Sequence, residues 1–347
     1  MIRRLLLAVG AIVVPIASLN IVARRASRRL LDGPRTTPDE AALGPALDAL
    51  GGEVVRIRAR DGLRLSGRWL APETADPAWT PDPHDAILLL HGWSGSIVPH
   101  LVEYGPFLRR TAGVLGLDFR GHGGSDASPT TFGLREVEDV AGALFWLGER
   151  GIDRVALVGM SMGGITAIAS VAVLGEGSFV GTDVDPAAPA HVRPPRRPRI
   201  VAVVADSVAP ELAAVGVPLI PGPHPRLLAE RLFDAAARTL GGDPRETEPI
   251  RVIGLLEGVD LLLISGDQDA IVPVDDARRL AAAAPLGTEL WIVPGAGHRG
   301  AHRVDPATYE ARTTSHLRAA FLRGREADPI IGAPAHAPVA SGDILED

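Results

Sequence analysis

Residues 159–163 have the spacing Gly-x-Ser-x-Gly, with Ser161 at the centre. This pattern is typical of a nucleophile elbow, a sharp strand-to-helix turn that strains a serine and exposes its hydroxyl. Glycines are needed at both flanks because a Cβ there would collide with the neighbouring strand or helix. A strand-like apolar run precedes the motif, and a helix-like run, 165–173, follows it. We therefore predict that Ser161 is a nucleophile rather than part of a plain turn.

A serine hydroxyl is a weak nucleophile that needs a histidine base, and the histidine needs a carboxylate to fix its tautomer. The chain offers both groups after strand-like segments. Asp267 and Asp269 follow residues 260–264, and His298 follows residues 289–293. Strand-end loops of a parallel sheet share one edge, so we expect these side chains near Ser161.

The elements that would position these residues alternate between buried strands and helices. The expected strands are 86–90, 113–117, 154–158, 200–205, 260–264 and 289–293, and the expected helices are 135–150, 275–284 and 306–323. Residues 53–60 and 63–70 alternate apolar and polar side chains around Asp61-Gly62, which predicts a hairpin with a two-residue turn. The alternation indicates an α/β fold with a mainly parallel sheet.

Five motifs together resemble the α/β-hydrolase superfamily over residues 53–323. They are His91-Gly92-Trp93, Asp118-x-Arg120-Gly121-x-Gly123-x-Ser125, Gly159-x-Ser161-x-Gly163, Gly266-x-x-Asp269 with Val272-Pro273, and Gly297-His298. The resemblance implies an α/β-hydrolase fold, with helices on both faces of the sheet and a small cap, and hydrolysis of an acyl bond. The early hairpin and the second motif are similar to the serine aminopeptidase-like, monoglyceride-lipase-like and acyl-thioesterase-like branches.

The resemblance also assigns roles to individual residues. Ser161 would be the nucleophile, His298 the general base and then acid, and Asp269 its orienting carboxylate. The backbone N–H groups of Trp93 and Met162 would form the oxyanion hole. No cofactor is required.

Alternatives remain for the acid and for a metal. The spacing from Gly266 favours Asp269 over Asp267, and Asp206, at the end of another expected strand, could be a displaced acid. His302 lies a helical turn beyond His298, a spacing that could ligate zinc. No carboxylate or further histidine is arranged with this pair, so we predict no metal site.

Three other polar residues of the motifs are expected to be structural. We predict that His91 braces the oxyanion loop through hydrogen bonds, and that Arg120 and His122 stabilise their own loop.

Composition excludes several classes of protein. The chain has 347 residues, a formal net charge of −7 and no cysteine, which argues against a general nucleic-acid binder and excludes disulfides and cysteine nucleophiles. The spacing of residues 159–164 does not fit a dinucleotide loop, and no phosphate-binding loop is present. Because residue 161 is serine and not aspartate, a haloalkane dehalogenase is not expected.

The N-terminal residues predict a membrane anchor. Residues 5–23 are apolar and nearly uncharged, which is about long enough to cross a bilayer as a helix. No clean cleavage site follows, so we predict an uncleaved anchor over 1–30 rather than a signal peptide or a surface helix. Arginines are denser after the run than before it, which favours a cytoplasmic catalytic part, with export as the alternative.

The rest of the chain divides by composition. We predict a linker over 31–52, a hydrolase domain over 53–327 and a disordered tail over 328–347. Within the domain, residues 207–250 are expected as a cap and 175–199 as a mobile surface loop, whose basic end is a solvated linker rather than a lipid contact.

These observations predict a membrane-tethered serine hydrolase of carboxylic esters, with a small-molecule acyl substrate, preferably apolar. The alternatives are an acyl-thioesterase or an aminopeptidase, which would need an acidic cap residue such as Glu211, Glu230 or Asp234 to hold a free amine. A noncatalytic binding protein on the same fold is an alternative of another class. The sequence leaves the oligomeric state open.

Overall fold

The computed structural model describes residues 26–33, 35–36, 38–93, 95–175, 197–216 and 225–327. The expected anchor segment 5–23, most of the expected loop 175–199 and the expected tail 328–347 lie outside the described residues. Within these described ranges, no helix is both long enough and apolar enough to span a bilayer.

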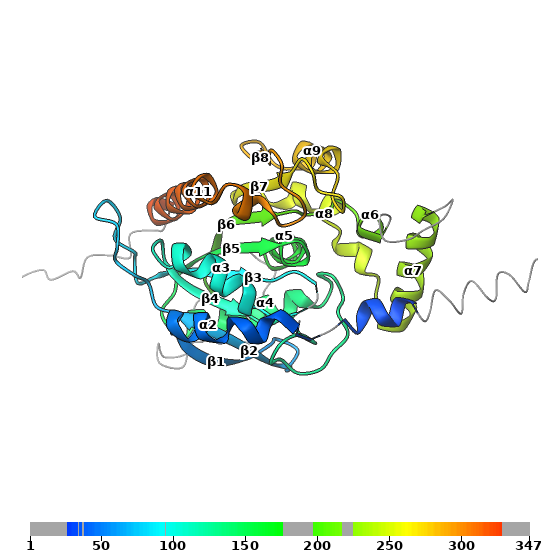
Figure 1. Ribbon diagram of the computed structural model, residues 1–347, viewed down its shortest axis with the longest axis horizontal. Helices are drawn as coiled ribbons and strands as arrows, with labels where there is room; N and C mark the ends of the chain where they lie inside the picture. The colour runs from blue at the N-terminus through cyan, green and yellow to red at the C-terminus, as the bar shows by residue number, and fades with distance from the viewer. Residues whose placement is uncertain are drawn as a thin grey trace, which may run out of the picture.

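A single eight-stranded sheet forms the centre of the fold, in the order β1-β2-β4-β3-β5-β6-β7-β8 (Figure 1). β2 pairs antiparallel with β1 and β4, and all other neighbours are parallel, which confirms the predicted mainly parallel sheet. The strands are β1 (Glu53–Arg58), β2 (Arg64–Leu70), β3 (Asp85–Leu90), β4 (Gly113–Leu117), β5 (Arg154–Met160), β6 (Arg199–Asp206), β7 (Asp260–Gly266) and β8 (Glu289–Val293).

The predicted hairpin is present, but its turn is one residue longer than expected. The N–H of Ala59 donates to the carbonyl of Leu63 and the N–H of Gly62 to that of Ala59, both at 2.8 Å, so three residues, 60–62, form the loop. Gly62 has a φ of 97°, which an L side chain rarely adopts. A tight turn followed by a left-handed residue is a common three-residue hairpin, and it suits this glycine as well as a two-residue turn does.

Helices cover both faces of the sheet, as predicted. α3 (Val98–Leu108) and α11 (Pro306–Ala327) pack on one face, and α4 (Glu136–Gly148), α5 (Met162–Leu174) and α9 (Val274–Ala283) pack on the other. Side chains of β3 alternate between the two cores, with Ile87 and Leu89 in one and Leu88 and Leu90 in the other. This burial on both sides explains why the strand is a continuous apolar run.

Shorter elements complete the described chain. They are η1 (Pro38–Leu43), α2 (Gly44–Leu50), α6 (Leu212–Gly216), α7 (Pro225–Leu240), η3 (Pro244–Thr247), α8 (Pro249–Val252), η4 (Ile253–Leu255) and α10 (Ala301–Val304). η1 and α2 lie within the expected linker and contact α3. α6, α7 and η3 lie within the expected cap, and α8 begins there but ends two residues beyond it.

The first described residues, 26–31, are helical and lie beside α7 (Figure 1). Leu31 is buried there in a small cluster with Ala236 and Leu240. The chain therefore contacts α7 before it enters the sheet.

Candidate active site

Ser161 occupies a strained turn between β5 and α5. Its backbone has φ 52° and ψ −114°, a conformation that costs about 1–3 kcal/mol for a non-glycine residue. A Cβ on Gly159 would lie 2.4 Å from the backbone of Gly163, and a Cβ on Gly163 would lie 2.3 Å from the carbonyl oxygen of Leu90. These contacts are the steric reason for both glycines of the motif.

The side chains of Ser161, His298 and Asp269 form a continuous chain of hydrogen bonds. His298 Nδ1 lies 2.9 Å from Asp269 Oδ2, and His298 Nε2 lies 3.0 Å from Ser161 Oγ. A carboxylate can only accept, so Nδ1 carries the proton and Nε2 is free to accept the serine proton. The three residues follow β5, β7 and β8, whose carboxyl ends share one edge of the sheet.

Asp269 is oriented by its own loop. Its Oδ1 accepts the backbone N–H groups of Ile271 and Val272, each at 2.8 Å, which leaves Oδ2 for His298. Burial alone would raise the pKa of the Asp269 carboxyl. The hydrogen bonds from His298 and Val272 outweigh this effect, so the pKa is below its usual value. The carboxylate is therefore ionised at neutral pH.

The two alternative acids point elsewhere. Asp267 Oδ1 accepts the N–H of Gly295 at 2.7 Å. Asp206 accepts hydrogen bonds from the hydroxyls of Ser207, at 2.8 Å, and Tyr309, at 3.1 Å. Burial raises the pKa of Asp206 to about 6. Neither carboxylate bonds to His298, so the geometry favours Asp269.

The two expected oxyanion donors flank Ser161. Met162 is the first residue of α5, and Trp93 lies in the loop that follows β3. In the described part of the chain, neither backbone N–H is donated to a protein acceptor. Both donors are therefore available to a substrate oxygen.

His91 is buried behind this loop. Its Nδ1 lies 2.6 Å from the carbonyl oxygen of Gly92, so Nδ1 donates, and Nε2 accepts the N–H of Phe119 at 3.0 Å. These bonds join the loop after β3 to the loop after β4. Burial, together with the nearby His122, lowers the pKa of His91 well below its ordinary value, so the ring stays neutral.

Arg120 forms the buried centre of the loop after β4. Its guanidinium bonds to Asp139 of α4, at 2.7 Å, and to Asp61 of the hairpin turn, at 2.8 Å. The side chains of Arg120 and Asp139 are 1% and 0% exposed, whereas that of Asp61 is 38% exposed. The sequence indicated a structural role for Arg120 but not these distant partners.

Replacing Asp139 by alanine is expected to lower the free energy of unfolding by about 3–5 kcal/mol, because it leaves a buried guanidinium short of its main partner. The matched variant Asp61→Ala removes a partly exposed partner of the same arginine and should lower it by about 1 kcal/mol or less. Urea unfolding of both variants checks this. Equal effects would mean that burial does not set the strength of this network.

His302 does not share a metal site with His298. Its Nδ1 lies 3.1 Å from Glu103 and its Nε2 3.4 Å from Glu310, while both nitrogens of His298 face Ser161 and Asp269. Among the residues that the structure describes, no group of three or more potential ligands could hold a metal ion.

The acidic cap residues already have arginine partners. Glu211 pairs with Arg226 at 2.7 Å and with Arg279 at 3.2 Å. Glu230 also lies 3.4 Å from Arg226, and Asp234 lies 2.9 Å from Arg245. Binding of a substrate amine by these carboxylates would have to displace an arginine.

The N-terminal segment contacts the loop after β3, the expected oxyanion loop, which the sequence did not reveal. The indole Nε1 of Trp93 donates to the carbonyl of Leu30 at 3.0 Å. Ser96 donates its N–H and its hydroxyl to the two carboxylate oxygens of Glu40, at 3.0 and 2.7 Å. We call residues 26–40 the N-terminal strap, excluding the undescribed positions 34 and 37. The strap contacts both the oxyanion loop and α7.

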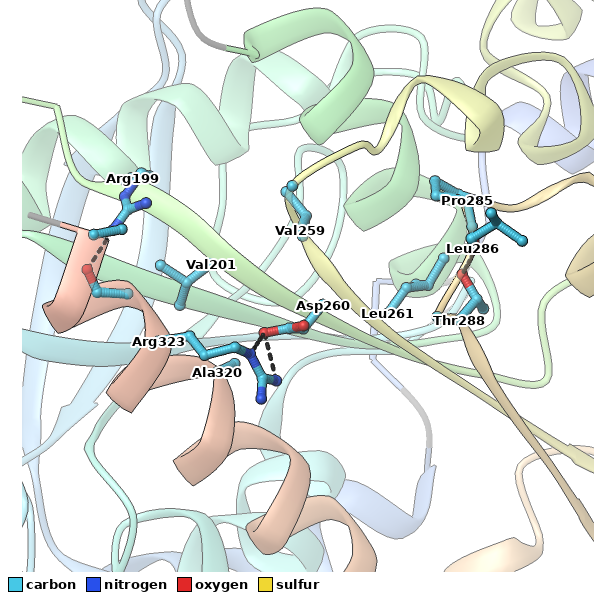
Figure 2. Close-up of a pocket in the computed structure, with 14 residues that line it drawn as sticks. Arg199, Val201, Val259, Asp260, Leu261, Pro285, Leu286, Thr288, Ala320 and Arg323 are labelled. Atoms are coloured by element: carbon cyan, nitrogen blue, oxygen red, sulfur yellow. Dashed lines mark hydrogen bonds and ion pairs between the residues drawn. The ribbon is translucent and has the colours of Figure 1, made fainter.

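Figure 2 shows a cavity of about 360 Å³. It lies near the starts of the parallel strands, whereas Ser161 follows the end of β5. The cavity is lined by the first residues of β6 and β7 and by α11. Figure 2 shows Arg323 beside Asp260, and these two side chains form an ion pair of 2.8 Å. The residues that line this cavity include none of Ser161, Asp269 and His298.

The sequence of the chain is similar to one family model and to several proteins of known sequence. A family model described as "Alpha/beta hydrolase family" matches residues 87–312. The uncharacterized protein YfhR of Escherichia coli O157:H7 is 28% identical over 75% of this chain and 78% of its own length. The uncharacterized protein Rv2307c of Mycobacterium tuberculosis H37Rv is 30% identical over 80% of this chain and 82% of its own.

Among solved structures, the esterase Pf2001 of Pyrococcus furiosus is similar in fold. It superposes with a TM-score of 0.58 at 22% identity, covering 83% of this chain and 97% of that chain. At this identity the likeness concerns the fold alone.

Proposed function

Because the chain belongs to the alpha/beta hydrolase family, we propose that it is a serine hydrolase that cleaves carboxylic esters through an acyl-enzyme. The observation that carries this proposal is the hydrogen-bonded series from Ser161 through His298 to Asp269, at 3.0 and 2.9 Å. Esterases among the solved structures of similar fold agree with a small-molecule substrate.

The reaction follows from the positions of the protons. Ser161 Oγ attacks the ester carbonyl carbon while His298 Nε2 takes its proton, and Asp269 stabilises the resulting imidazolium. The N–H groups of Trp93 and Met162 stabilise the negative oxygen of the tetrahedral intermediate. Collapse of the intermediate expels the alcohol, which receives the proton from His298. Water, activated by the same histidine, then hydrolyses the acyl-enzyme.

The substrate proposed first is an ester with an apolar acyl group, with a thioester as the alternative. The same machinery cleaves both, because the bond to the leaving group is the only difference. The ion pairs of Glu211, Glu230 and Asp234 weigh against an aminopeptidase, since these carboxylates already bind arginines.

Labelling with a fluorophosphonate probe tests the proposal. The probe reacts with activated serines, so we expect one modified peptide, carrying the label on Ser161. Absence of label on the folded protein would favour a noncatalytic binding protein on this fold. Label on another serine would reject Ser161 as the nucleophile.

We further propose that residues 5–23 anchor the enzyme to a membrane, with the catalytic domain in the cytoplasm. The support is the length and apolar character of this segment and the arginines that follow it. Deleting residues 1–25 is expected to move the protein from the membrane pellet to the supernatant without loss of ester hydrolysis. A truncated protein that still sediments with membranes would reject a single N-terminal anchor.

A longer deletion, of residues 1–37, tests the N-terminal strap, and the deletion of residues 1–25, which leaves the strap in place, is its control. It removes the Leu30 carbonyl, which accepts from Trp93, and Leu31, which packs on α7. We expect kcat to fall by roughly ten-fold, since displacing an oxyanion donor weakens transition-state stabilisation. Equal activity of the two deletions would mean that the strap does not position the oxyanion loop.

A further inference from the structure

Arg299 lies directly beside the nucleophile and follows His298 in the chain. A Cβ built on Gly92, the residue before the oxyanion donor Trp93, would lie 3.1 Å from Arg299 Nη1 and 3.6 Å from Ser161 Cβ. The guanidinium therefore borders the space beside Gly92, and the Cβ of Ser161 borders the same space.

The backbone of Arg299 is strained into this position. Its φ is 54°, and its N–H donates to the hydroxyl of Ser207 at 2.9 Å. A left-handed backbone conformation persists at a residue with a long side chain only where the surroundings impose it. Such strain concentrates at functional sites.

Among the residues that the structure describes, none pairs with the guanidinium of Arg299. In the described part of the chain it makes no hydrogen bond and no ion pair, although it is half-buried. Other inward-facing arginines have two carboxylate partners each: Arg120 has Asp61 and Asp139, Arg154 has Asp82 and Asp85, and Arg245 has Asp234 and Asp243. A partly buried cation without a counter-charge is unfavourable, so this arrangement points to a negative charge that a ligand supplies.

The groups around Arg299 do not supply that charge. His100 is buried, and burial, with the Arg299 charge second, lowers its pKa to about 4, so it is neutral. Glu103 is engaged by His302 at 3.1 Å. Arg303 on α10 is a second cation, and it donates to the carbonyl of Arg299 at 3.4 Å.

We propose that Arg299 binds an anionic group of the substrate, a carboxylate or a phosphate, and thereby selects acidic esters. The guanidinium offers two parallel N–H donors that match the oxygens of either group. This inference rests on the proposed function, because it concerns the substrate of the same site. Arg299 is a specificity-determining residue and takes no part in proton transfer.

Matched esters with and without an anionic group test this proposal. On the alcohol side, the butyrate monoesters of glycerol, glycerol 3-phosphate and glycerate compare no charge, a phosphate and a carboxylate. On the acyl side, 4-nitrophenyl pentanoate is compared with mono-4-nitrophenyl glutarate. The kcat/KM of each is measured for the full chain and for Arg299→Gln, Arg299→Lys and the neighbouring control Arg303→Gln.

We expect at least one anionic ester to exceed its neutral partner by about ten-fold or more in kcat/KM, as for a hydrogen bond to a charged group. The ratio should fall to about one in Arg299→Gln and be unchanged in Arg303→Gln. Lysine keeps the charge but lacks the planar fork, so Arg299→Lys should lower the ratio severalfold. If Arg299→Gln does not fold, the test rests on Arg299→Lys, in which an unchanged ratio of kcat/KM for anionic and neutral esters would reject the proposal.

Three results would overturn the proposal: a wild-type ratio near one, a preference that persists in Arg299→Gln, or equal loss of all ester hydrolysis and fluorophosphonate labelling in that variant. The last result would make Arg299 a positioning residue. Normal labelling of Ser161 with no anionic preference rejects only the role of Arg299. Absence of both labelling and hydrolysis in the wild type rejects the proposed function and this inference with it.

Discussion

Replacing Ser161 by alanine is expected to lower kcat for ester hydrolysis by about 10⁶-fold, as when the nucleophile of a serine protease is removed. The triad has no second hydroxyl that could take its place, because His298 Nε2 bonds only to Ser161 Oγ among the described residues. The fold should be retained, since alanine in the same left-handed conformation is no more strained than serine. Hydrolysis of a 4-nitrophenyl ester and the melting temperature measure the two effects separately.

Ser170→Ala is the matched control for this substitution. Ser170 lies on the same helix, α5, and its buried hydroxyl has no hydrogen-bond partner among the described residues. We expect wild-type kcat in this variant. Hydrolysis by Ser161→Ala at more than about one hundredth of the wild-type rate would exclude the acyl-enzyme mechanism, because the oxyanion hole alone supplies only a small part of the acceleration.

The sequence predicted the strands and helices whose pattern of apolar residues and turns lies within a single segment. β4 and β8 have the predicted bounds, because an apolar run between turns needs no information from distant residues. The positions of Ser161, Asp269 and His298 at strand ends followed from the same local patterns. Their catalytic roles stay predictions.

Other features could not be predicted because they depend on distant partners. No helix was predicted where α3 lies, and its two prolines both resemble breaks. Pro99 instead lies in the first turn, where proline is tolerated, and Pro106 is accommodated inside the helix. The contact of Glu40 with Ser96 joins residues 56 positions apart. Arg299 gave no motif signal, because Gly92, beside which its guanidinium lies, is more than 200 positions away in the chain.

The second large effect expected is a loss of about 10⁴-fold in kcat for Asp269→Asn, caused by the wrong tautomer of His298. The loop predicts how the amide would be oriented. Because Oδ1 of Asp269 accepts the N–H groups of Ile271 and Val272, the amide oxygen would take that place and the NH₂ would face His298 Nδ1. A donor there requires an unprotonated Nδ1, which moves the ring proton to Nε2. The base could then no longer accept the proton of Ser161.

Asp267→Asn is the control, since its carboxylate lies two residues away and accepts from Gly295 instead of His298. We expect its kcat to stay within about two- to three-fold of wild type, because no group of the triad changes its protonation. Fluorophosphonate labelling adds an independent reading of nucleophile activation, which should be slow in Asp269→Asn and normal in Asp267→Asn. The reverse order would identify Asp267 as the acid. An equal loss of kcat in both variants would mean that the shape of the loop, and not the charge of Asp269, supports His298.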